Sequence, residues 1–314
     1  MNRRARAELI VDRTLAILDS LPVRLVSLVI LVAFWYSLSL RPWHNDAWHM
    51  LDAWRNGPLY PVAWLQPASA YGYSPIFPQL LFPLTHVGWP HLSELWDAVQ
   101  IVALVWMLGP ALAVVALYFP WPALPGFGTA VQATINNGNP QLVFAAFIVI
   151  ALTRFPVAWT FVLLTKSSSG IGILYYAFMR QWRTLATVVG VTIAISAFSF
   201  VLNPAWTFEW IRVWLDAATR TGSGPAVSRE IFVAVPMPVR SIIGVGVVAL
   251  AARTNKLWLV PLGCFLALPD IHLGGFAVLT AVPAVWLRTR HRGGETAATP
   301  SEPSPATRLA PAAA

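Results

Sequence analysis

The chain has 314 residues, of which 57% are hydrophobic and 11% are charged, with 16 tryptophans and a formal net charge of +8. Soluble domains carry about a quarter of charged residues, so this composition excludes a soluble cytoplasmic enzyme. The basic residues lie at the termini and in short connectors, where they indicate membrane topology, and they form no DNA-binding motif. At about 20 apolar residues per crossing, we expect one all-α polytopic membrane protein with about 8 to 10 transmembrane helices. The single cysteine, Cys264, excludes a disulfide framework and a cysteine-based metal site.

The first 40 residues predict a signal anchor. Residues 1–20 are rich in arginine and precede an apolar segment, 21–40, which is interrupted only by Arg24. By the positive-inside rule, residues 1–20 form a cytoplasmic N-terminal segment. No small-residue cleavage site follows, so we expect the anchor to be retained. Residues 41–74 then form an external loop.

The middle of the chain predicts several membrane segments with breaks. Residues 98–153 contain no Asp, Glu, Lys, Arg or His and are interrupted at Gly109-Pro110, at 120–122 and at the polar stretch 136–140. Such a run requires at least two crossings and a dipping or re-entrant piece. Arg154 and the Arg180 to Arg183 stretch mark cytoplasmic ends, which places Lys166 near the opposite face.

The C-terminal third predicts further crossings. A crossing at 184–202 leads to a second external loop, 203–239, in which Trp206, Trp210 and Trp214 recur every fourth residue. That spacing predicts a helix that lies in the membrane interface. The crossings 240–252, 257–268 and 273–287 complete a multi-helix transmembrane domain over 21–288. Residues 289–314 are rich in Ala, Pro, Thr and Ser, so we expect a disordered cytoplasmic tail.

Ionisable residues near a bilayer are costly, and here they gather on the predicted external side. In the first loop, Asp46 and His49 are three residues apart and share one face of a short helix. Asp46 as a simple N-cap is the alternative. A metal site from His44, Asp46, His49 and Asp52 has suitable ligand types, but no spacing signature indicates one.

Two further polar clusters follow. The stretch 136–141 reads Asn-Asn-Gly-Asn-Pro-Gln, and Lys166 precedes three serines and a glycine. A cation with backbone N–H groups at a helix start suits a phosphate, while a lysine that only snorkels to the interface is the alternative. At 270–272, Asp-Ile-His is either a cap with an interfacial His or a base that titrates near neutral pH. Asp97 and Gln100, near the start of a crossing, are interpreted as an end-of-helix pair.

The order of these elements resembles a known family. Asp46 follows the first helix, and after it come Gly57-Pro58-Leu59-Tyr60, Tyr73-Ser74-Pro75, Gly138-Asn139-Pro140-Gln141, Lys166 and a late His272. This order is similar to the polyprenyl-phosphate-mannose-dependent mannosyltransferases of glycosyltransferase family 87, which have the GT-C architecture. The resemblance spans roughly residues 40 to 185. It departs at Met50, where the family usually has tyrosine.

The resemblance implies an inverting transfer of a sugar, most often mannose, from a polyprenyl phosphate to a lipid or glycan acceptor on the extracytoplasmic face of the plasma membrane. Asp46 is the expected base, and His272 is a rival or assisting group. Lys166 is expected to stabilise the departing phosphate. The remaining substrate-binding residues that we expect are His49, Tyr60, Tyr73, Asn137, Asn139, Gln141 and Arg229. No cofactor, metal or nucleic-acid partner is expected.

Two other classes stay open. A transporter or flippase predicts ionisable residues along a path at mid-membrane and often an inverted repeat, and the sequence shows neither. A catalytically inactive membrane scaffold gains support from the departures from the family pattern at Met50, at Pro75-Ile76 and at Gly138-Asn139-Pro140-Gln141. Replacement of Asp46 by Asn separates the classes, because a scaffold tolerates this change.

Overall fold

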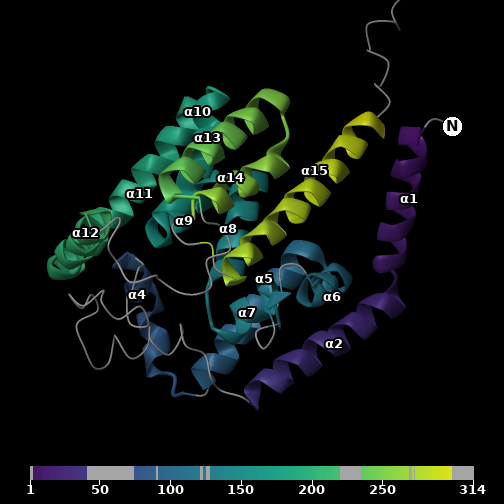
Figure 1. The fold of residues 1–314 in the computed structure, drawn as a ribbon, viewed down its shortest axis with the longest axis horizontal. Coiled ribbons are helices and arrows are strands. Elements are labelled where there is room, and N and C mark those ends of the chain that lie inside the picture. The colour runs from purple at the N-terminus through teal and green to yellow at the C-terminus, as the bar shows by residue number, and fades with distance from the viewer. Residues whose placement is uncertain are drawn as a thin grey trace, which may run out of the picture.

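The computed structural model describes residues 3–40, 74–89, 91–120, 123–124, 128–219, 235–268, 271 and 273–298. Within these residues the chain is almost entirely helical, and the strands seen are β1 (Ala123–Leu124) and β2 (Gly128–Thr129), which pair antiparallel. The expected all-α class is therefore confirmed. Figure 1 shows the helices gathered around a centre formed by α8, with α1 and α2 along one side.

The N-terminal half contains α1 (Arg3–Leu18), α2 (Leu21–Ser39), α4 (Ile76–Leu81), the 3-10 helix η1 (Phe82–His86) and α5 (His91–Leu108). They are followed by α6 (Pro110–Tyr118), α7 (Ala130–Asn136) and α8 (Gln141–Thr153). The next elements are η2 (Pro156–Ala158), α9 (Trp159–Thr165), η3 (Ser167–Ile173), α10 (Leu174–Phe178) and α11 (Trp182–Leu202). The C-terminal part comprises α12 (Pro204–Thr219), α13 (Met237–Thr254), η4 (Leu257–Leu259), α14 (Val260–Leu266), η5 (Leu273–Thr280) and α15 (Ala281–Ala298).

Among the described residues, three helices, α2, α11 and α13, are long and apolar enough to cross a membrane. Two further pairs qualify if each bent pair is one span: α5 with α6, bent by 115°, and α7 with α8, bent by 112°. Both bends fall at breaks that the sequence predicts. Gly109 has a φ of 78°, which favours glycine, and Pro110 starts α6 because the first turn of a helix needs no N–H from that residue. The count of 8 to 10 crossings and the GT-C architecture stay predictions.

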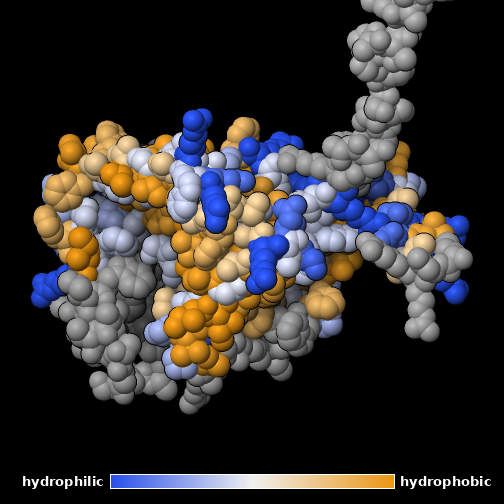
Figure 2. Space-filling model, turned by 90° about the horizontal axis from the view of Figure 1, so that it is seen from above, coloured by the Kyte–Doolittle hydropathy of each residue, from blue (hydrophilic) through white to orange (hydrophobic). Residues whose placement is uncertain are grey.

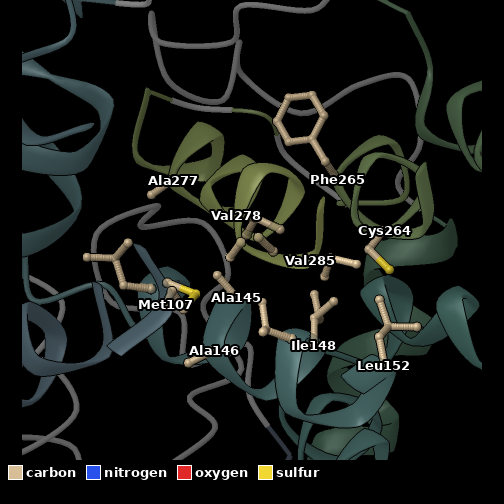
Figure 3. Packing of buried hydrophobic residues seen from close by; sticks show 14 of the residues in the cluster. Met107, Ala145, Ala146, Ile148, Leu152, Cys264, Phe265, Ala277, Val278 and Val285 are labelled. Atoms are coloured by element: carbon tan, nitrogen blue, oxygen red, sulfur yellow. The ribbon is translucent and has the colours of Figure 1, made fainter. Parts of the chain in front are cut away.

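The core forms around α8, which is apolar on all sides. Ala145, Ile148 and Val149 on this helix are each 0% exposed, as a helix without a polar face requires. Figure 3 shows residues of α5, α14, η5 and α15 converging on it, among them Met107, Cys264 and Val285. The core therefore binds together segments that are more than a hundred residues apart.

Much of the remaining apolar surface faces outwards. The window that qualifies α11 as a span is only 11% buried inside the protein, and Ile193 and Val201 are 62% and 75% exposed. Figure 2 shows hydrophobic surface spread over one face, interrupted by separate hydrophilic side chains. Exposed apolar area on this scale indicates contact with lipid chains, so the fold is that of a membrane-embedded protein.

The first and last described helices contact each other. Arg290 on α15 lies 2.7 Å from the Asp12 carboxylate on α1, and Arg288 Nη2 donates to the Trp106 carbonyl at 2.8 Å. The helix α15 continues to Ala298, ten residues into the segment that we expected to be a disordered tail. The helical run carries on because Ala, Arg and Glu favour helix and no proline occurs between 284 and 298.

Candidate functional site

The structure describes four of the ten site residues that the sequence predicts. Asn137, Asn139 and Gln141 lie at the break between α7 and α8, and Lys166 lies at the end of α9. The other six, Asp46, His49, Tyr60, Tyr73, Arg229 and His272, lie outside the described residues.

The break between α7 and α8 is a tight turn in the protein interior. The Gly138 N–H donates to the Ile135 carbonyl and the Asn139 N–H to the Thr134 carbonyl, both at 2.9 Å. Gly138 has a φ of 69°, which is why a glycine suits this position. Asn139 is 7% exposed and Gln141 is fully buried. The turn therefore holds two amide side chains inside the helix bundle.

Helix α5 brings two more polar side chains to this turn. Trp96 Nε1 donates to the Gly138 carbonyl at 2.7 Å, and the next residue, Asp97, is 1% exposed. Gln100, one turn further along α5, is 0% exposed. Asp97 and Gln100 are the seventh and tenth residues of the 18-residue α5, so they lie within the helix and in the core rather than at a helix end. Their spacing with buried Leu104 places all three on one helix face, and this stripe could have identified them.

Two of these buried amides are not satisfied by protein. Gln100 and Gln141 have no hydrogen-bond partner for either side-chain N or O within the described part of the chain. A buried amide without partners costs about 1–3 kcal/mol, so such groups generally bond to ordered water or to a bound ligand.

Lys166 lies at the same end of the bundle as Gln141. Helix α9 follows α8 after a short turn and packs against it. The centroid of the Phe161 ring lies 3.9 Å from that of Phe147 and 5.9 Å from that of Phe144. The chain then returns, because Tyr176 Oη donates to the Ala151 carbonyl at 2.8 Å. Lys166, which directly follows α9, therefore lies away from the C-terminus of α8 and towards its N-terminus.

The segment after Tyr73 docks on α9. Ser74 Oγ donates to the Leu164 carbonyl, and the buried Phe77 ring lies 6.3 Å from Phe161. Residues 74–77 thus pack on α9, and α9 packs on α8, which places residues 74–77, 138–141 and 166 at the same end of the bundle.

The segment that leads to His272 is anchored nearby. Thr134 Oγ1 on α7 donates to the Gly274 carbonyl at 2.7 Å. The buried Arg240 guanidinium on α13 donates to the Val235, Leu266 and Leu268 carbonyls at 2.8, 3.1 and 2.7 Å. These bonds hold the end of α14, so the chain on both sides of residues 269–272 is fixed at this end of the bundle.

Among the described residues, no group of three or more His, Cys, Asp or Glu side chains is arranged to hold a metal ion. No family model, curated protein or solved structure matches the chain. The functional argument therefore rests on the residues themselves.

Proposed function

We propose that the protein is an inverting glycosyltransferase that moves a sugar, mannose in the first instance, from a polyprenyl phosphate to a lipid or glycan acceptor on the extracytoplasmic face. The observation that carries the proposal is that Phe161 on α9 packs against Phe77 and against Phe144 near the start of α8, so that the elements carrying residues 74–77, 138–141 and 166 lie at one end of the bundle. These are three of the elements whose order resembles family 87. A catalytic site assembled from such distant elements requires this convergence, whereas a resemblance by chance does not.

The proposed chemistry places charge where the reaction develops it. As the bond from the sugar to phosphate breaks, negative charge grows on the departing polyprenyl phosphate. Lys166 supplies a cation, and Asn137 and Asn139 supply amide donors at the same end of the bundle. Asp46 takes the proton of the attacking hydroxyl, with His272 as the rival base. Inversion follows from attack on the face opposite the phosphate.

A membrane location suits a polyprenyl donor, because the lipid tail stays in the bilayer while the phosphate reaches the interface. The contact between Asp12 and Arg290 joins α1 to α15, which supports the placement of both termini on one side, the cytoplasm. Arg154, which follows α8, lies at the other end of that helix from Gln141. By the positive-inside rule this arrangement supports an extracytoplasmic site.

The test uses membranes that contain the protein or its Asp46→Asn variant, incubated with radiolabelled polyprenyl-phosphate mannose and a lipid extract. Label should move into lipid or glycan with the wild type and not with Asp46→Asn. Asp12→Asn is the matched control, since its carboxylate lies on α1, and it should transfer normally. Absence of transfer by well-folded wild type with mannose and with other polyprenyl-linked sugars contradicts the proposal.

A transporter or flippase is the second candidate, because discontinuous helices such as α7 and α8 often line transport sites. It predicts that sugar lipid added to one leaflet of a proteoliposome crosses to the other without an acceptor. An inactive scaffold predicts neither movement nor transfer.

A further inference from the structure

Helices α5 and α8 run side by side in the same direction. Trp96 near the start of α5 contacts Gly138 just before α8, and the far ends of both helices pack against α15, where Arg288 bonds the Trp106 carbonyl. Asp97 therefore lies level with the first turn of α8, which begins at Gln141, and Gln100 lies within a turn of it. Three buried polar side chains thus share one level of the core.

The atoms left without a partner define the ligand chemistry. Both amides, Gln100 and Gln141, have an unused N–H₂ donor and an unused C=O acceptor within the described residues. A metal cation uses only oxygens and would leave both N–H₂ groups unsatisfied. A phosphate uses only donors and meets the Asp97 carboxylate. A hydroxyl both donates and accepts, so neighbouring hydroxyls satisfy every one of these groups.

We propose that Gln100, Gln141 and Asp97 form a subsite for the hydroxyl groups of a sugar. The inference rests on the proposed function, which supplies sugars as substrates, and it assigns to α5 a binding role that the resemblance does not give. In this conformation the amide atoms are closed off from solvent.

The subsite makes an unusual prediction about stability. A buried amide without a partner destabilises the ligand-free protein. Gln100→Leu and Gln141→Leu keep about the same side-chain size and remove this destabilisation. The free variants should melt at or above the wild-type temperature. A purely structural pair of amides would behave in the opposite way, since loss of bonded groups lowers stability. The matched control is Gln181→Leu, which alters an exposed amide.

The experiment measures ligand binding by purified protein in nanodiscs, with intrinsic tryptophan fluorescence as the signal. Polyprenyl-phosphate mannose is compared with sugar-free polyprenyl phosphate, and octyl α-mannopyranoside with octanol. We expect each Gln→Leu variant to lose roughly tenfold in affinity for one sugar-bearing probe, which corresponds to the loss of one or two hydrogen bonds. Sugar-free probes should bind unchanged. Loss for the first probe assigns the subsite to the donor, and loss for the second assigns it to the acceptor.

Three results would overturn the subsite: a clear drop in the melting temperature of the free variants, unchanged affinity for both sugar-bearing probes, or no preference of the wild type for a sugar-bearing probe over its sugar-free counterpart. The transfer assay separates this inference from the proposed function. If sugar binding depends on the two glutamines but wild type transfers no sugar to any acceptor, the subsite stands and the transferase proposal fails.

Discussion

Gly172 lies at the contact that holds η3 against the core. An added Cβ there would lie 2.8 Å from Cys264 Sγ and 2.8 Å from Trp159 Cζ2, and would overlap Trp159 Cη2. Both neighbours are 0% exposed. A rigid, enclosed indole cannot swing aside, so Gly172→Ala forces η3 away from α14 or distorts the ring packing.

Overpacking of this kind costs about 1–3 kcal/mol. We expect the purified protein in detergent to melt roughly 2 to 10 °C lower than wild type. The assay follows tryptophan fluorescence during heating, to which Trp159 contributes together with the other tryptophans of the chain. Gly190→Ala is the control, because nothing lies within 4 Å of an added Cβ at that position in α11. Alanine there should be neutral or slightly stabilising. If Gly172→Ala melts no lower than Gly190→Ala, the packing of η3 described here is incorrect.

Three other substitutions test separate contacts. Gly244→Ala places a Cβ 2.8 Å from the Gly263 carbonyl, where α13 crosses α14, so we expect a loss of about 1–3 kcal/mol by thermal melting, while Gly246→Ala, with open space around it, should change little. Arg240→Lys cannot reproduce the planar fork that bonds three backbone carbonyls, and should increase protease cleavage in the α13 to α14 region although the charge is kept. Lys166→Met should lower the transfer rate by about a hundredfold with little change in melting temperature, if this lysine stabilises the departing phosphate; an unchanged rate would assign it to simple snorkelling.

The sequence predicts the helix breaks well because their cause is local. Gly109-Pro110 and Gly138 mark bends through backbone preferences that involve only their own residues. The same holds for α11, whose continuous apolar run predicts a crossing at 184–202 and matches Trp182–Leu202. The helical form of α12 also follows from its tryptophan spacing.

The packing partners could not be predicted in this way. The spacing of Asp97, Gln100 and Leu104 indicates one buried helix face, but the segment that covers it is known only from the Trp96 contact with Gly138, across 42 residues. The Arg240 bonds likewise depend on α14 ending against α13. Such contacts depend on tertiary arrangement, for which a single sequence has no periodic signal. The end of α15 was not predicted for a different reason. The composition of residues 289–314 indicated a disordered tail, whereas local helix preference extends the helix to Ala298.

The bend between α7 and α8 explains how an apolar bundle can hold polar side chains inside. A straight α8 extended towards residue 130 would satisfy its own backbone, and it would leave no turn for Trp96 to bond. The break satisfies these backbone groups locally. The Gly138 and Asn139 N–H groups donate to carbonyls of α7, and the Gly138 carbonyl accepts a hydrogen bond from the Trp96 indole. The backbone hydrogen-bonding groups named above are thereby satisfied by α7 and by α5. Among the described residues the amides of Gln100 and Gln141 then have no hydrogen-bond partner, as the proposed sugar subsite requires.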